Sequence, residues 1–187
     1  MGDKKAENNQ KVLLVIDIQE DYTGDTATRP FPYKDSDQFI AGVNKIIEAA
    51  SMKNIIVVYI KQEFDNFMGK MFSQLFCGGT AIKGSPGAQI DKRINIKSDF
   101  CFSKPGADAF SSVKFREFLN EYKVSELYLV GLDAQFCIYS TAKGAKKHGY
   151  DVTIIKDGII LMDEKKWDEL LKKYERNGFK LISSVEL

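Results

Sequence analysis

Short apolar runs that end in a polar or turn-forming residue recur along the chain. Residues 11–17 read KVLLVID, and residues 54–60 read NIIVVYI. Unbroken runs of this length are typical of strands buried on both faces of a parallel sheet. The pattern predicts six strands, over residues 11–17, 54–60, 97–102, 126–131, 151–155 and 179–182.

Segments with helical spacing of apolar residues separate most of these strands. Helices are predicted from Ser36 as N-cap to residue 51, from Ser111 or Ser112 to Tyr122, over 137–149, and from Asp163 to a stop at Gly178. A short helix is possible over 84–91, while residues 18–35 and 61–84 are predicted as loops. Alternating strands and helices favour one α/β domain, over residues 11–187, after a flexible tail at residues 1–10.

The expected apolar faces of two of these helices can be named from the same spacing. They are Phe39, Val43, Ile46 and Ile47 in the first helix, and Val113, Phe115 and Leu119 in the second.

Composition and charge exclude several classes of protein. The chain has 187 residues, 44% of them hydrophobic, and a net charge of +1, so nothing indicates a nucleic-acid or membrane partner. It contains no apolar run of about 18 residues and no signal-peptide core, so we expect a cytoplasmic protein. Three cysteines and a single histidine, without metal-ligand spacing, favour neither a disulfide framework nor a zinc site.

Three chemically reactive side chains fall at or just beyond the carboxyl ends of predicted strands: Asp17, Lys104 and Cys137. In an open parallel sheet this edge is where ligands bind. Cys137 is also predicted at the start of a helix, where the helix dipole favours a thiolate. His148 is predicted to cap the far end of that helix, so no histidine joins the three, and Cys77 and Cys101 are expected to be structural.

Four motifs in the right order resemble the isochorismatase-like cysteine hydrolases, the superfamily that includes nicotinamidases. They are LLVIDIQEDY from residue 13, GSPG at 84–87, FSKPGADAF at 102–110, and GLDAQFCIYSTAKGAKKHGYDVTIIKDGI from residue 131. The resemblance covers most of the chain, roughly residues 11–184. It implies a three-layer α/β/α fold with a six-stranded, mainly parallel sheet in the order 3-2-1-4-5-6.

The resemblance also implies a catalytic triad of Cys137, Asp17 and Lys104. Lys104 would stabilise the thiolate, and Asp17 would carry the proton that histidine carries in other enzymes. The backbone N–H groups of Asp133 and Cys137 would form the oxyanion hole, with a cis peptide at Leu132–Asp133. The Asp133 side chain could repel an anionic substrate, bind a cationic one, or point away.

The predicted substrate pocket consists of Gln19, Tyr22, Phe31, Glu63, Phe67 and Phe102. The aromatic members could instead belong to the core, and Gln19 could either orient the triad or pair with backbone. Nicotinamidases hold a metal through an aspartate and histidines after the second strand. Here that segment, KQEFDNFMGK, has no histidine, so we expect no metal and no cofactor.

The sequence therefore predicts a hydrolase that cleaves a C–N bond of a small amide through a thioester acyl-enzyme. Three alternatives stay open: hydrolysis of an ether or ester-like bond, as in isochorismatases, a catalytically silent binding or scaffold protein, and a redox-sensing thiol protein. The expected partners are a small-molecule substrate and, by resemblance, further copies of the chain in a homo-oligomer (dimer or tetramer).

Overall fold

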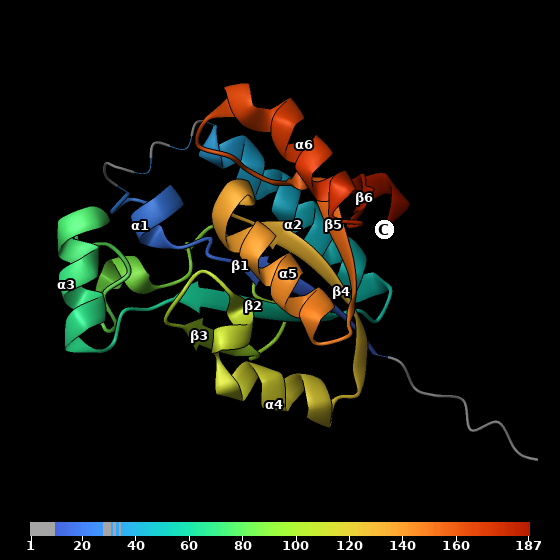
Figure 1. The fold of residues 1–187 in the computed structure, drawn as a ribbon, viewed down its shortest axis with the longest axis horizontal. Coiled ribbons are helices and arrows are strands. Elements are labelled where there is room, and N and C mark those ends of the chain that lie inside the picture. Colours follow the sequence, from blue (N-terminus) through green and yellow to red (C-terminus); the bar gives the residue numbers. More distant parts are fainter. Residues whose placement is uncertain (1–9, 28–30, 32, 34) are drawn as a thin grey trace, which may run out of the picture.

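A computed structural model describes residues 10–27, 31, 33 and 35–187 of the protein. Its centre is a six-stranded sheet in the order β3-β2-β1-β4-β5-β6 (Figure 1), with every neighbouring pair parallel. The strands are β1 Gln10–Ile16, β2 Ile56–Gln62, β3 Cys101–Lys104, β4 Val124–Gly131, β5 Asp151–Ile159 and β6 Lys180–Ile182. The predicted fold class and strand order are confirmed. The predicted tail lies outside the described residues except for Gln10, which begins β1.

Helices cover both faces of the sheet (Figure 1). They are α1 Glu20–Thr23, α2 Ser36–Met52, α3 Phe67–Phe76, α4 Val113–Glu121, α5 Tyr139–Lys147 and α6 Trp167–Arg176. Alternate residues of β1 face opposite layers: Val12, Leu14 and Ile16 pack toward α4, α5 and α6, while Leu13 and Val15 pack toward α2. All five are buried, which is why the strand reads as an unbroken apolar run.

Helices α1 and α3 were not predicted, because both lie in segments rich in turn formers or aromatic residues. The Asn66 side chain caps α3 by accepting a hydrogen bond from the Gly69 N–H at 2.7 Å. A local cap of this kind satisfies a free N–H of the first turn. The segment predicted as a loop over residues 61–84 therefore contains a helix, and many of its large apolar side chains belong to that helix.

The predicted strand over residues 97–102 is wrong in position, since β3 begins at Cys101 and ends at Lys104. Side-chain hydrogen bonds, and not a ladder of backbone hydrogen bonds, fix the segment that precedes β3. The Tyr59 hydroxyl donates to the Asn95 carbonyl and accepts from the Lys97 N–H, and the Ser98 hydroxyl donates to the Val57 carbonyl. The shift brings Lys104 to the last position of β3, in register with Gln62 of β2.

Helix boundaries differ from the prediction at several ends. Asp35, in a left-handed conformation and without a side-chain cap, precedes α2, so Ser36 is not its N-cap. The segment predicted to begin as a helix at Cys137 starts with a π-helical turn, Ala134–Ile138. Beyond Asp163, one 3₁₀ turn precedes α6.

Other predicted helix features agree with the structure. His148 caps α5, and Gly178 has a positive φ just beyond α6. The predicted faces of α2 and α4 are also found, except that Val113 is exposed. Among the described residues, no helix has the length and apolar character needed to cross a membrane.

Gly131 ends β4, where it stands in register with Ile16, the last residue of β1. Its φ is +121°, and a Cβ placed on it would lie 2.0 Å from the Ile16 carbonyl oxygen. Both the backbone conformation and the space exclude a larger residue. This contact fixes the sheet edge from which the following turn, with Cys137, departs.

We predict that Gly131→Ala lowers the free energy of unfolding by about 3 kcal/mol or more, because strand β4 must move away from β1. The matched control is Gly42→Ala inside α2, where the added Cβ meets only the Asp157 carbonyl at 3.9 Å. That control should be neutral or stabilising by up to about 1 kcal/mol. Urea denaturation of both variants measures the difference, and equal stability would contradict the packing argument.

Candidate active site

Asp17, Lys104 and Cys137 come from three separate segments and meet at the carboxyl edge of the sheet. Asp17 directly follows β1, Lys104 ends β3, and Cys137 lies in the turn after β4. The Lys104 Nζ atom is 2.9 Å from Asp17 Oδ2 and 3.4 Å from Cys137 Sγ. The structure therefore brings the three predicted catalytic side chains into direct contact, across the point where the strand order reverses between β1 and β4.

Lys104 is fully buried, with 0% of its surface exposed. Besides Asp17 and Cys137, its ammonium contacts Gln62 Oε1 at 2.8 Å and the Gly106 carbonyl at 3.0 Å. Burial by itself would lower the pKa of Lys104, but its interactions with Asp17, above all, and with Cys137 outweigh burial and raise the pKa above its ordinary value. Lys104 is therefore held as a cation in the interior.

Asp17 has one engaged and one free carboxylate oxygen. Oδ2 pairs with Lys104, whereas the buried Oδ1 has no hydrogen-bond partner among the described residues. The residue has a φ of 56°, and its N–H donates to the Ile60 carbonyl at 2.9 Å, which fixes the backbone just beyond β1. Asp17 also lines the cavity described below, so a strong acceptor is available beside the thiol.

The Cys137 thiol differs from its predicted state. Burial, followed by the negative charge of Asp17, raises its pKa to about 12, against the opposing effect of Lys104. Cys137 lies within the π-helical turn that leads into α5, and not at the start of α5 itself. At neutral pH the resting residue is a thiol, and an attack on a carbonyl needs a base to remove its proton.

The peptide bond between Leu132 and Asp133 is cis, as the resemblance predicted. No hydrogen bond between described residues uses the Asp133 N–H. It is therefore one donor free to face a developing oxyanion, which is the role predicted for it together with the Cys137 N–H.

The Asp133 side chain, whose role the sequence left open, holds the turn together. It accepts hydrogen bonds from the N–H groups of Gln135 at 2.7 Å and Met162 at 3.0 Å, and from the Tyr33 hydroxyl at 3.3 Å. The carboxylate thus caps the turn that carries Cys137 and ties it to the segment after β5.

Gln19 pairs with backbone, one of its two predicted alternatives. Its side-chain amide donates to the carbonyls of Gln62 at 3.0 Å and Ala88 at 2.9 Å, and accepts from the Gln62 N–H at 2.8 Å. These bonds fix the carboxyl end of β2. Gln19 does not line the cavity.

Gln62 is a site residue that sequence reasoning missed. Its Oε1 accepts from Lys104, and its buried Nε2 has no partner among the described residues. Only its place at a strand end could have identified it, since no motif includes it.

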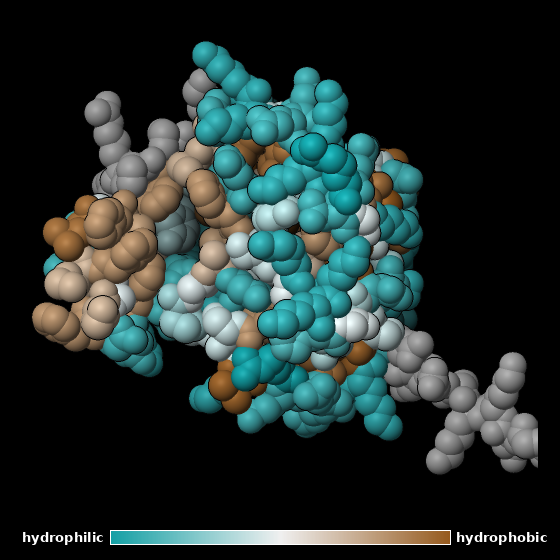
Figure 2. Space-filling view, in the orientation of Figure 1, coloured by the Kyte–Doolittle hydropathy of each residue, from teal (hydrophilic) through white to brown (hydrophobic). Residues whose placement is uncertain are grey.

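A cavity of about 1190 Å³ opens at Asp17 and Cys137. Of the predicted pocket residues, Tyr22 and Phe31 line it. The other aromatic side chains of its wall lie outside the six named pocket residues: Tyr33, Phe64, Phe72, Phe76 and Phe136. In the space-filling view, hydrophobic residues gather over α3, beside the hollow (Figure 2).

Three predicted pocket residues lie elsewhere. Glu63 contacts Lys61 and Ser103 beside the site. Phe67 is 80% exposed on α3, and Phe102 packs in the core against α4. The alternation of side chains along β3 directs Phe102 into the core, and the helical phase of α3 directs Phe67 outward. The sequence prediction had neither β3 in its true position nor α3.

The residues after β2 do not fit the metal site that nicotinamidases carry there. Glu63 is engaged by Lys61 at 3.1 Å, and Asp65 pairs with Lys83 at 2.7 Å. Nowhere in the described part of the chain do three Cys, His, Asp or Glu side chains cluster as metal ligands.

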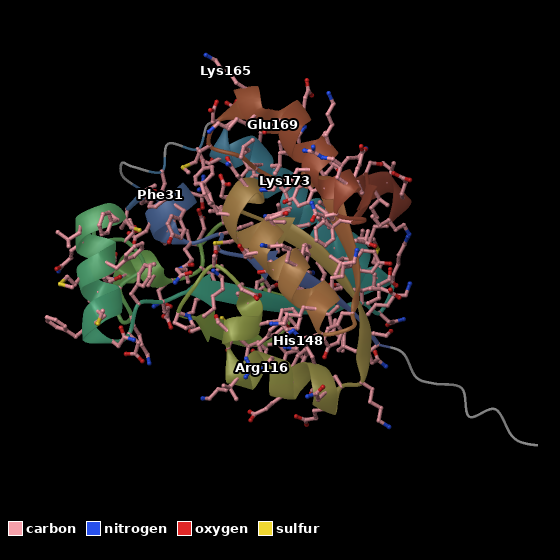
Figure 3. All side chains as sticks on the ribbon, in the orientation of Figure 1. Phe31, Arg116, His148, Lys165, Glu169 and Lys173 are labelled. Carbon is pink, nitrogen blue, oxygen red and sulfur yellow. The ribbon has the colours of Figure 1, made fainter. Side chains whose placement is uncertain are left out.

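His148 lies away from the site. It stacks on Phe110 with ring centroids 4.8 Å apart, and its Nδ1 is 2.8 Å from the Gly144 carbonyl. In Figure 3 it lies near α4, far from Phe31 of the cavity wall. The single histidine of the chain is thus a helix cap.

The fold is a parallel sheet with helices on both faces, and it carries a cysteine, a lysine and an aspartate where the strand order reverses. A family model described as the isochorismatase domain matches residues 11–186, and the chain belongs to this family.

Individual relatives agree with this assignment. A protein of Arabidopsis thaliana named a probable inactive nicotinamidase is 29% identical over 155 residues, which cover 78% of each chain. A nicotinamidase of Bacillus subtilis has a TM-score of 0.81 at 19% identity, covering 93% of this chain and 99% of its own. A cysteine hydrolase of Pseudomonas syringae has a TM-score of 0.83 at 14% identity, covering 95% and 90%.

We predict that Asp17→Asn lowers the pKa of Cys137, since the Asp17 carboxylate raises it and Lys104 would remain to stabilise the thiolate. Thiolate absorbance near 240 nm, followed as a function of pH, should show titration at a lower pH than in the wild-type protein. Glu63→Gln, which removes a carboxylate outside the contact, is the control. An unchanged or raised pKa in Asp17→Asn would contradict the assigned coupling.

Proposed function

We propose that the protein hydrolyses a C–N bond of a small-molecule amide, with Cys137 as nucleophile and a thioester acyl-enzyme as intermediate. The observation that carries the proposal is the buried ammonium of Lys104, which contacts both Asp17 Oδ2 and Cys137 Sγ, two residues that line a cavity. An acid, a cation and a thiol in mutual contact are the groups that covalent thiol catalysis needs in the absence of histidine.

In the first half of the reaction, Asp17 Oδ1 takes the Cys137 proton as Sγ attacks the substrate carbonyl carbon. Lys104 stays charged and stabilises the sulfur as it becomes a thiolate. The N–H groups of Asp133 and Cys137 bind the oxyanion of the tetrahedral intermediate; one such donor is typically worth about 3 kcal/mol. Asp17 then protonates the leaving nitrogen, the C–N bond breaks, and an amine or ammonia departs.

In the second half, Asp17 is again ionised and accepts a proton from water. The oxygen of that water attacks the thioester carbon, and the same donors bind the second oxyanion. Cleavage of the C–S bond releases the carboxylic acid while the proton returns to Sγ. The cycle consumes one water molecule and needs no further reactant.

The name of the Arabidopsis relative raises the alternative of a catalytically silent protein. Against it stands the contact of Lys104 with both Asp17 and Cys137, together with a carboxylate oxygen of Asp17 that has no hydrogen-bond partner among the described residues. Hydrolysis of an ether or ester-like bond without the thiol is the second candidate, because Asp17 alone can serve as its acid. A small-molecule substrate and a homo-oligomer remain part of the proposal.

We predict that Cys137→Ala loses at least about 10³-fold in kcat on a panel of amides. Rapid quenching of the wild-type protein with substrate should give an acyl mass increase on the peptide that contains Cys137. Cys101→Ala should keep the adduct, because Cys101 is an exposed cysteine that lines no part of the cavity. Full activity in Cys137→Ala would instead favour the ether or ester reaction, and no turnover with any amide would favour a binding protein.

We also predict that Lys104→Met lowers the free energy of unfolding by about 3–5 kcal/mol, because it leaves the buried Asp17 carboxylate without its cation. Combining it with Asp17→Asn should recover part of that loss, since no unpaired charge then remains in the interior. Denaturant unfolding of the two single variants and the double variant measures the coupling. Strictly additive losses would show that the pair does not depend on mutual charge compensation.

A further inference from the structure

The wall that α3 contributes to the cavity at Cys137 is apolar. Of the α3 side chains, Met68, Phe72 and Phe76 line it, spaced four residues apart so that they share one face of the helix. Their exposed fractions are 70%, 49% and 68%. Apolar side chains as large and as exposed as these are typical of a binding surface. Because they surround a reactive group, we infer that an apolar ligand covers them.

The polar groups of the same cavity leave few sites for a polar ligand. The Tyr33 hydroxyl donates to Asp133, and Asp65 at the exposed rim pairs with Lys83. Among the described lining atoms that are buried, only Asp17 Oδ1 and Gln62 Nε2 lack a partner. These two atoms belong to the two side chains that contact Lys104, one as an acceptor and one as a donor. The unpaired buried polar atoms of the wall therefore lie at the reacting end, whereas the α3 side chains of the wall are apolar.

The charges of the described lining residues are all of one sign. Asp17, Asp65 and Asp133 contribute carboxylates, and no lysine, arginine or histidine is among the described residues of the wall. The nearest buried cation, Lys104, is already engaged by four acceptors. An anionic ligand would lose its hydration and meet carboxylates. A cationic one would also lose its hydration and would find these carboxylates already engaged: Asp17 by Lys104, Asp65 by Lys83, and Asp133 by three hydrogen-bond donors.

Resting on the proposed function, we propose that the substrate is an uncharged carboxamide whose carbonyl carries a bulky apolar group, about as large as a bicyclic aromatic ring. The carboxamide combines an N–H donor for Asp17 Oδ1 with a carbonyl acceptor for the oxyanion donors. The apolar group lies against the α3 face formed by Met68, Phe72 and Phe76. The cavity volume of about 1190 Å³ exceeds what a single-ring amide needs.

The test uses two matched series of primary amides with the full-length protein. The first is acetamide, benzamide and 2-naphthamide, in which only apolar size grows. We expect kcat/KM to rise about tenfold or more from benzamide to 2-naphthamide, as burial of additional apolar surface predicts. The second is 4-methylbenzamide, 4-carbamoylbenzoate and 4-(aminomethyl)benzamide, which differ in charge. The uncharged member should exceed both charged members at least about tenfold.

A pair of variants on one helix assigns the size preference to the cavity wall. Phe72→Ala should reduce the ratio of 2-naphthamide to acetamide activity about tenfold, because it removes a lining ring. Phe67→Ala removes an exposed ring of α3 that does not line the cavity, and should leave the ratio within about twofold. Met68→Ala provides a second lining variant if Phe72→Ala fails to fold.

Binding separates the failure of this inference from the failure of the proposed function. Calorimetric titration of Cys137→Ser with 2-naphthamide and with 4-carbamoylbenzoate reports recognition without turnover. Tight binding of the first and weak binding of the second supports the inference, even if no amide is hydrolysed. Preference for acetamide, for the anion or for the cation would overturn it, whether or not the protein proves to be an amidase.

Discussion

The ammonium of Lys104 is the contact on which the site depends. A charge without any exposure is destabilising unless its neighbours compensate it, and here four acceptors from separate segments converge on Nζ. The same convergence fixes Asp17, Gln62 and Cys137 relative to one another. The contacts that compensate the buried charge are therefore the same contacts that assemble the catalytic groups. Both depend on the alignment of the carboxyl ends of β1, β2 and β3.

The surrounding hydrogen bonds place these groups accurately. Gln19 fixes the end of β2, and the Asp133 carboxylate caps the turn after β4 through the N–H groups of Gln135 and Met162. Gly131 allows β4 to approach β1 closely at the start of that turn. Because the catalytic atoms are held by contacts at strand ends, the wall contributed by α3 can change without moving them.

Several features of the site were predictable because they depend on local sequence. Asp17 ends an unbroken apolar strand, and Cys137 and Lys104 stand within motifs that resemble the family's. The cis peptide before Asp133 also followed from that resemblance. The cavity wall was predicted less well, because Phe67 and Phe72 look equivalent in sequence, and only the phase of α3 directs one outward and the other inward. Gln62 carries no local pattern, and its role arises from its register with Lys104 on the next strand.

The sequence by itself determined the alternation of strands and helices, the family and the identity of the reactive side chains, since these depend on hydrophobic periodicity and short motifs. Only the tertiary structure decided the protonation state of Cys137, because the pKa of a thiol depends on burial and on charges from distant segments. It likewise decided the position of β3 and the apolar, carboxylate-lined character of the cavity. Those properties arise where segments far apart in the chain come into contact, and local sequence patterns do not predict such contacts.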